Sequence, residues 1–445
     1  MAACLEQINR VNPKLNAIVA RLDDDACFAL ADEADQRLAR GEPVGPLHGL
    51  PWAFKDLEAA VGFPWTRGSP IFRHFMPEED SYIVDRLRRA GVLAIGKTNV
   101  SEFGMGSQTY NQVYGITRNP YDQTKTAGGS SGGAGAALAS GMLPLADGSD
   151  LGGSLRNPAS FDNIVALRPT VSLVPTGPVL LPFLPFNVNG PMARSVADAA
   201  FLLSVMAGAD ARDPMSYPSD PARFLQPLER DFRGVRVAWC PDLGGLPLDN
   251  RVGTVLAAQR ATFEALGCVV EEASPDLRGA DEVFLALRAW NSWTSLGPLL
   301  QAHRAEFKPE AIWQIEWGSH ISADEIARAM IQHGEIMERM RRFQERYEFL
   351  LCTVSQVPPF DAGLPWPREI EGAAMENYIA WMKSAFHITV TFCPAAAVPA
   401  GFTPEGLPVG IQIVGRYRDD LGVLQLAHAF EQATGYGAMR PTIAN

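Results

Sequence analysis

The chain has 445 residues, of which 47% are hydrophobic, so it can bury a large core without disulfides or metal ions. Its net charge is −12 and its basic residues are scattered, which argues against nucleic-acid binding because that task needs a basic face. The ordinary composition, with 20% charged residues, also excludes disordered, collagen-like and coiled-coil chains.

The positions of the cysteines, histidines and apolar residues indicate which cofactors and which cellular compartment to expect. The six cysteines form no CxxC pair, as is typical of free thiols in a reducing compartment. No close set of histidine and cysteine ligands occurs, so we expect no metal and no other cofactor. The N-terminus lacks an apolar signal core, and the most apolar stretch, residues 178–188, is short and interrupted by prolines. We expect a cytoplasmic protein, monomeric or homodimeric, that binds a small molecule and neither nucleic acid nor a membrane.

Helix-then-strand units are the first elements that can be read along the chain. Asp80 is a plausible N-cap, the apolar residues that follow share one helical face, and Gly91 ends this predicted helix. Residues 92–95 then read as a short buried strand. The same order recurs later, with a helix over 250–266 and a strand over 268–270.

The middle of the chain, residues 207–347, has a different texture. A turn-rich stretch leads into a predicted helical region that holds Trp290, Trp293, Trp313 and Trp317. We expect an elaboration of one domain that caps a substrate pocket. Filling of a helical core by these tryptophans is an equally good interpretation.

The C-terminal part returns to alternating elements. A turn at 404–406 precedes a predicted strand at 409–414, and an amphipathic helix follows over about 421–433. Alternating helices and strands predict an α/β fold with a central sheet covered by helices on both faces.

A segment dense in glycine, residues 126–169, is the chemically unusual part of the chain. It contains neither GKS/T nor GxGxxG, which argues against a phosphate cradle. A flexible linker is a poor interpretation too, because residues 134–145 are apolar and predict a closely packed helix. Residues 128–132 match GxSxG, but the preceding residues are polar rather than a hydrophobic strand, which disfavours a nucleophile elbow.

Several segments, in order, resemble the amidase signature family. The glycine- and serine-rich segments at 128–133 and 148–156 carry the likeness, and a lysine segment at 49–56 adds to it. Further matching segments are residues 96–103, 119–120, 190–198, 394–401 and 406–415. The resemblance implies one amidase signature domain over residues 1–445, a single large α/β domain with a central mixed β-sheet.

The resemblance also implies a Ser–cis-Ser–Lys triad. Ser154 matches the nucleophile, Ser130 the bridging serine that follows a cis peptide bond, and Lys55 the base. A serine hydroxyl needs a base to become nucleophilic, and lysine can act as that base only when burial lowers its pKa. Backbone N–H groups of Leu151, Gly152, Gly153 and Ser154 are expected to form the oxyanion hole.

Supporting residues follow by the same match. Asp150 and Arg156 are expected to brace the loop of the nucleophile, although an ordinary buried ion pair is an equivalent interpretation. Ser131 is expected to support Ser130. Pocket-lining residues implied by the match are Met105, Gly106 and Ser107.

This sequence also departs from the family pattern at several positions. Ser149 and Arg168 stand where the family commonly has threonine and lysine. The segment 161–163 and the short N-terminus differ as well.

The resemblance predicts hydrolysis of carboxylic amide C–N bonds through an acyl-enzyme on Ser154. Apolar residues 173–189, with Trp290, Trp293, Phe392 and His387, favour aryl amides or anilides, with aryl carbamates and esters as further substrates. One alternative is the glutaminase A-type subunit of a tRNA-dependent amidotransferase, although no glutamine-recognising charged pair is apparent. Another is a non-catalytic binding protein, against which the intact triad argues.

Overall fold

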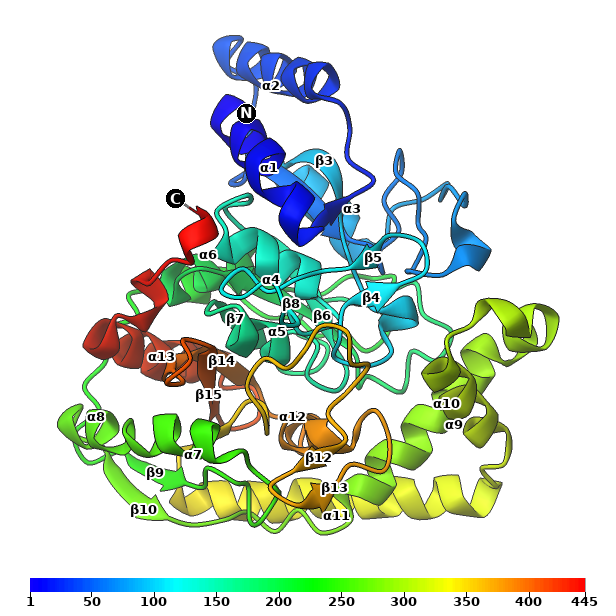
Figure 1. The fold of residues 1–445 in the computed structure, drawn as a ribbon. Coiled ribbons are helices and arrows are strands. Elements are labelled where there is room, and N and C mark those ends of the chain that lie inside the picture. Colours follow the sequence, from blue (N-terminus) through cyan, green and yellow to red (C-terminus); the bar gives the residue numbers. More distant parts are fainter. Residues whose placement is uncertain (445) are drawn as a thin grey trace.

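The computed structural model describes residues 1–444 and is built around a mixed eight-stranded sheet (Figure 1). The outer strands β10, β9 and β11 pair in parallel, and all later neighbours pair antiparallel. In spatial order the strands are β10 (Val269–Glu272), β9 (Arg236–Trp239), β11 (Phe349–Thr353), β15 (Pro408–Val414), β14 (Ala395–Phe402), β7 (Val165–Arg168), β8 (Val188–Ala193) and β6 (Ala146–Asp150).

Helices cover both faces of this sheet. Successive side chains of a strand point to opposite faces, and on β9 Val237 and Trp239 enter one core while Ala238 enters another. The first face packs against α3 (Tyr82–Arg89), α6 (Val196–Met206), α7 (Asn250–Ala257), α8 (Arg260–Ala265) and α13 (Asp420–Thr434). The second packs against α4 (Gly132–Ala139), α5 (Arg156–Phe161), α9 (Ala280–His303), α10 (Pro309–Ser319), α11 (Ala323–Arg346) and α12 (Lys383–Thr389). The predicted α/β class is therefore confirmed.

A small three-stranded sheet places the lysine segment against the main sheet. Its order is β1 (Ile18–Val19), β3 (Leu93–Thr98) and β2 (Pro51–Lys55), with β2 parallel to β3. Helices α1 (Ala2–Leu15) and α2 (Asp24–Ala39) lie beside this sheet at the top of Figure 1. The remaining short strands are β4 (Tyr110–Asn111), β5 (Gly115–Ile116), β12 (Glu369–Ile370) and β13 (Ala373–Ala374).

Two of the predicted helices differ in detail from the structure. The N-cap of α3 is Ser81, because Asp80 accepts the Val61 N–H and pairs with Arg88 instead of capping the helix. The helix predicted over 250–266 is two helices, α7 and α8, separated at residues 258–259. The apolar spacing runs through this break, so the sequence pattern did not reveal it.

The stretch 207–347 is mainly helical only from residue 280 onward, and before that point it holds just the two short α-helices α7 and α8. Strands β9 and β10 within it belong to the main sheet, and helices α9, α10 and α11 follow from residue 280 onward. Among residues 1–444, no helix is long and apolar enough to cross a membrane.

Candidate active site

Lys55 ends β2 with its ammonium group buried beneath the glycine-rich segment. The side chain is fully buried, and its Nζ lies 3.0 Å from Ser130 Oγ, 2.7 Å from Ser131 Oγ and 2.9 Å from Ser149 Oγ. The Ser149 carbonyl lies 3.2 Å from the same Nζ. Burial lowers the pKa of Lys55 to about 7, although the carboxylates of Glu58, Asp147 and Asp150 act in the opposite direction. A neutral lysine is thus accessible near neutral pH.

Ser130 follows a cis peptide bond with Gly129, as the family resemblance implies. Residues 126–129 form a loop rather than a strand, so the strand that a nucleophile elbow requires is missing before Ser130. Helix α4 begins immediately afterwards and is fully buried along its length. It ends at Ala139, short of the predicted residue 145.

Ser154 lies in the loop between β6 and α5, 6% exposed and at the wall of a cavity. Its hydroxyl makes no hydrogen bond to any residue of 1–444, whereas its carbonyl accepts the Ser131 N–H at 3.3 Å. The Gly153 N–H donates to Asp150 Oδ1 at 2.8 Å. Of the four donors expected in the oxyanion hole, Gly153 is therefore the one whose N–H is already used inside the loop. Within the described chain the N–H groups of Leu151, Gly152 and Ser154 have no such partner.

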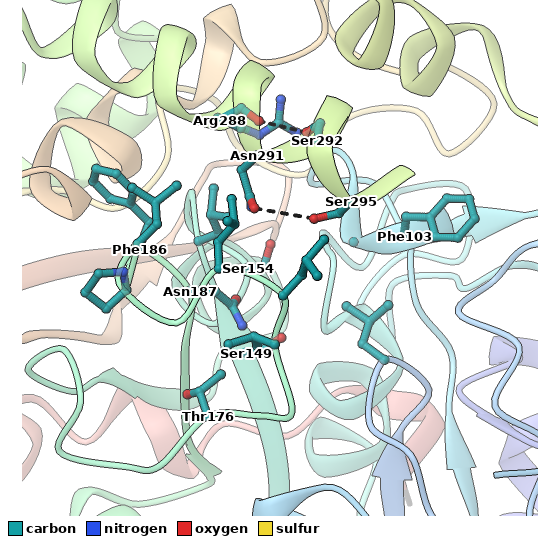
Figure 2. Close-up of a pocket in the computed structure, with 18 of the residues that line it drawn as sticks. Phe103, Ser149, Ser154, Thr176, Phe186, Asn187, Arg288, Asn291, Ser292 and Ser295 are labelled. Carbon is teal, nitrogen blue, oxygen red and sulfur yellow. Dashed lines mark hydrogen bonds between the residues drawn. The ribbon is translucent and has the colours of Figure 1, made fainter. Parts of the chain in front are cut away.

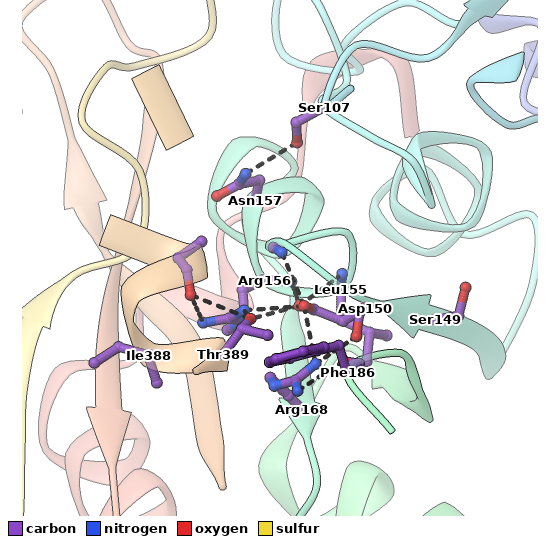
Figure 3. A network of polar contacts seen from close by, with 12 residues as sticks. Ser107, Ser149, Asp150, Leu155, Arg156, Asn157, Arg168, Phe186, Ile388 and Thr389 are labelled. Atoms are coloured by element: carbon purple, nitrogen blue, oxygen red, sulfur yellow. Dashed lines mark hydrogen bonds and ion pairs between the residues drawn. The ribbon is translucent and has the colours of Figure 1, made fainter. Parts of the chain in front are cut away.

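Asp150 holds this loop through two buried arginines (Figure 3). Its carboxylate accepts two bonds from Arg156, each 2.9 Å long, and lies 3.3 Å from the Arg168 guanidinium. Burial raises the pKa of Asp150, but the charges of Arg156 and Arg168 outweigh this and hold the pKa well below its ordinary value. Arg156 also reaches the Gln412 Oε1 at 2.7 Å, which ties the loop to β15.

A cavity of about 480 Å³ opens over Ser154 (Figure 2). One wall is the face of α9 that carries Phe284, Arg288, Asn291 and Ser295, and the opposite wall includes residues 176–182 and 184–187. The four tryptophans and the residues Phe392 and His387 named above do not line it. The aromatic side chains that do are Trp65, Phe103, Phe186 and Phe284.

Of the three residues predicted to line the pocket, two do so and one does not. Met105 and Gly106 border the cavity. Ser107 does not, because its hydroxyl donates to the Gly129 carbonyl and accepts from Asn157 Nδ2 at 3.0 Å. It braces the segment that holds Ser130 rather than lining the pocket.

Two polar residues of this site were missed by the sequence analysis as functional positions. Ser149 places both a hydroxyl and a carbonyl against Lys55, although the sequence showed only a departure from threonine. Asp147 accepts the Lys55 backbone N–H at 3.1 Å and the Trp52 Nε1–H at 2.8 Å, which fixes β2 on β6. Neither has a signal in spacing alone. Within residues 1–444, no group of three or more His, Cys, Asp or Glu side chains is placed to hold a metal ion.

Comparisons with known proteins show the family of the chain. The family model described as Amidase matches residues 1–424. An acylamidase of Rhodococcus erythropolis is 35% identical, covering 99% of this chain and 92% of its own. The A-type subunit of a glutamyl-tRNA(Gln) amidotransferase from Thermosynechococcus vestitus is 32% identical, covering 99% and 95%.

Solved structures give the same result. A bacterial aryl acylamidase of the amidase signature family superposes with a TM-score of 0.90 at 28% identity, covering 99% of this chain and 94% of its own. A 6-aminohexanoate cyclic dimer hydrolase superposes with a TM-score of 0.89 at 25% identity, covering 100% and 95%. The chain belongs to the amidase signature family and is an amide-hydrolysing enzyme.

Proposed function

We propose that Ser154 is the nucleophile, that Ser130 relays its proton and that Lys55 is the base. The observation that carries this proposal is the buried Lys55 Nζ, 3.0 Å from Ser130 Oγ and depressed in pKa to about 7. Neutral lysine offers a lone pair to the Ser130 hydroxyl, which can in turn accept the Ser154 proton when substrate brings the two serines together. Ser130 then returns the proton to the departing amine nitrogen.

The oxyanion of the tetrahedral intermediate is held by backbone donors. The N–H groups of Leu151, Gly152 and Ser154 are available for it, whereas that of Gly153 is not. Asp150 fixes their direction by binding the middle of the loop. Each donor of this kind contributes roughly 10²–10³ in rate in well-studied hydrolases. Collapse of the intermediate leaves an acyl group on Ser154 Oγ, which water then removes.

The substrates we propose are aryl amides and anilides. Aromatic side chains on several walls of the cavity favour a flat ring, because aromatic pairs add to the burial of apolar surface. The acylamidase relatives give independent support. Aryl carbamates and esters present the same carbonyl to Ser154 and are proposed as further substrates.

Labelling with a fluorophosphonate tests the nucleophile. We expect mass spectrometry to place a single adduct on Ser154, and the Ser154→Ala variant to remain unlabelled and inactive on acetanilide. The Ser131→Ala variant is the matched control and should still be labelled. An adduct on Ser130 in the wild type would overturn the assignment.

A glutaminase subunit of an amidotransferase is the second candidate, because relatives of that kind are 32–34% identical over nearly the whole chain. The charged residues that line the cavity are Glu58, Arg67, Asp213 and Arg288. The acids among them are already engaged, since Glu58 accepts from Ser81 and Asp213 from the Thr176 N–H. Burial raises the pKa of Glu58, which disfavours the carboxylate that the ammonium group of glutamine needs, and both oxygens of Asp213 accept backbone N–H groups. These observations favour the first candidate.

A further inference from the structure

Arg67 is an arginine of the cavity wall whose side chain makes no hydrogen bond within residues 1–444. Its guanidinium carbon lies 4.7 Å from the centre of the Trp65 ring, 4.0 Å from that of Phe72 and 5.7 Å from that of Phe103. Its Nε is buried without a partner, and no carboxylate of the described chain pairs with it. The aromatic contacts are therefore what holds the side chain in place.

Ring contacts leave the hydrogen-bonding capacity of an arginine unused. A ring attracts the face of the guanidinium group, whereas its five N–H donors lie in the plane of that group. Burial lowers the pKa of Arg67 to about 10, against the influence of Asp56, so the group stays charged at neutral pH. A charged, half-buried donor without an acceptor is costly, and a ligand in the cavity would remove that cost.

Arg67 belongs to the same wall as the reacting groups. Its carbonyl accepts the Phe103 N–H at 2.8 Å, and a Cβ built on the next residue, Gly104, would lie 3.5 Å from Ser130 Oγ. The other arginine of the cavity is engaged, because Arg288 donates to the Tyr378 hydroxyl at 2.6 Å and to Gln314.

We propose that Arg67 is a specificity-determining residue and that the preferred amides carry a carboxylate, which its N–H donors bind. The planar fork of a guanidinium matches a carboxylate with two parallel bonds. The surrounding rings suit an aromatic or aliphatic spacer between that carboxylate and the scissile amide. This proposal rests on the proposed reaction at Ser154.

Matched pairs of anilides test the proposal. We would measure kcat/KM for N-phenylsuccinamate against butyranilide, and for para-acetamidobenzoate against para-methylacetanilide, which place the carboxylate on either side of the bond. In at least one pair the wild type should favour the acid by roughly tenfold or more, as a charge-assisted hydrogen bond predicts. In Arg67→Met that ratio should fall to about one, and in Arg67→Lys it should be intermediate. The control is Arg73→Met, an exposed arginine nearby that donates to the Gln112 carbonyl.

A binding experiment separates this proposal from the proposed reaction. Calorimetric titration of the same pairs into Ser154→Ala should show the same preference for the acid, and this arm needs no turnover. Equal affinities within both pairs, or a preference that survives Arg67→Met, would overturn the role of Arg67. If the wild type prefers the acids but fluorophosphonate does not label Ser154, the proposed reaction at Ser154 is overturned and the role of Arg67 is not. If Arg67→Met does not fold, we would compare how strongly phenylpropanoate and phenylpropanol inhibit the wild type. Stronger inhibition by the carboxylate supports the proposal, and equal inhibition contradicts it.

Discussion

Two lysines lie at or next to the ends of the neighbouring parallel strands β2 and β3, and their surroundings differ. Lys97 on β3 is also fully buried, and burial lowers its pKa, but Asp56 at 3.5 Å acts in the opposite direction and favours the charged form. Lys55 on β2 has only serine groups within hydrogen-bonding distance of its ammonium. Removal of water without a compensating carboxylate is what makes its neutral form accessible. At the residue scale, the absence of an anion in contact with its ammonium group distinguishes Lys55, the proposed base, from Lys97.

We expect kcat/KM to rise with pH along a single limb with a midpoint near 7. A general base acts when deprotonated, and the pKa of Lys55 is lowered to about 7, so the active fraction grows as pH increases through that value. Lys55→Met should lower kcat by several orders of magnitude at every pH. Rates on acetanilide from pH 5 to 10 measure both effects.

The control for this limb is Lys97→Met, which should lower the melting temperature yet keep the midpoint near 7. Near-wild-type amide turnover by Lys55→Met at pH 8 would show that another group is the base. No histidine of the described chain lines the cavity, so an imidazole would have to reach it from outside.

Asp150→Asn should destabilise the fold by about 3–5 kcal/mol, because it leaves Arg156 and Arg168 buried without their anion. The pKa of Asp150 is depressed in the folded state, so its stabilisation is complete above the unfolded-state pKa near ~3.9 and is lost as pH falls below that value. Urea unfolding of wild type and variant should give curves that converge below about pH 4. A constant difference down to pH 2.5 would contradict this.

At the scale of elements, the sequence predicts those features that depend on local pattern. The helices and strands around residues 80–95 and 409–433 follow from apolar spacing, and the ordered motifs placed Lys55, Ser130 and Ser154 in one site. Contacts between distant segments were not predictable. The engagement of the Gly153 N–H depends on the orientation of a carboxylate within its loop.

Ser107 and Ser81 also make contacts with distant segments that local sequence could not predict. Ser107 bonds to Gly129, 22 residues away, and nothing in its own segment distinguishes this from a pocket-lining role. Ser81 replaces Asp80 as the cap because Asp80 is drawn to Arg88 and Val61. The Ser81 hydroxyl donates to Glu58 and makes no capping bond either, so tertiary contacts use both side chains that local propensity favours as caps.

Helix α4 depends on glycine to dock against the small sheet. A Cβ at Gly133 would lie 2.3 Å from the Asn99 nitrogen and 2.6 Å from the Ala17 oxygen, both backbone atoms that cannot move aside. We expect Gly133→Ala to lower the free energy of unfolding by about 2 kcal/mol or more, as overpacking does, and to lower kcat with it. Differential scanning calorimetry and acetanilide turnover measure the two effects.

The matched control is Gly334→Ala in α11, where a Cβ would meet nothing within 4 Å. There alanine should stabilise the helix by about 0.5–1 kcal/mol, because glycine loses more backbone entropy on folding. If both variants changed stability in the same direction, close docking would not be the reason for the glycine at Gly133.

At the scale of the whole molecule, one chain supplies every part of the site. The proposed base, Lys55, comes from β2 of the small sheet, and the proposed serines, Ser130 and Ser154, come from loops next to α4 and β6. Helix α9, which lies far later in the sequence, closes the cavity over them (Figure 2). The predicted elaboration over 207–347 therefore borders the cavity through α9, and we propose that it caps the substrate there.

The completeness of this site predicts activity without partner subunits. The purified chain alone should hydrolyse acetanilide or a related aryl amide, because the base, both serines, the oxyanion donors and the aromatic walls all belong to it. Its specific activity should not change when amidotransferase partner subunits are added, and Ser154→Ala should abolish it. Glutamine should be a poor substrate, since burial raises the pKa of Glu58 and favours its neutral form, and both oxygens of Asp213 already accept backbone N–H groups. Hydrolysis of glutamine that appears only after those partner subunits are added, with no turnover of aryl amides, would instead establish the glutaminase function.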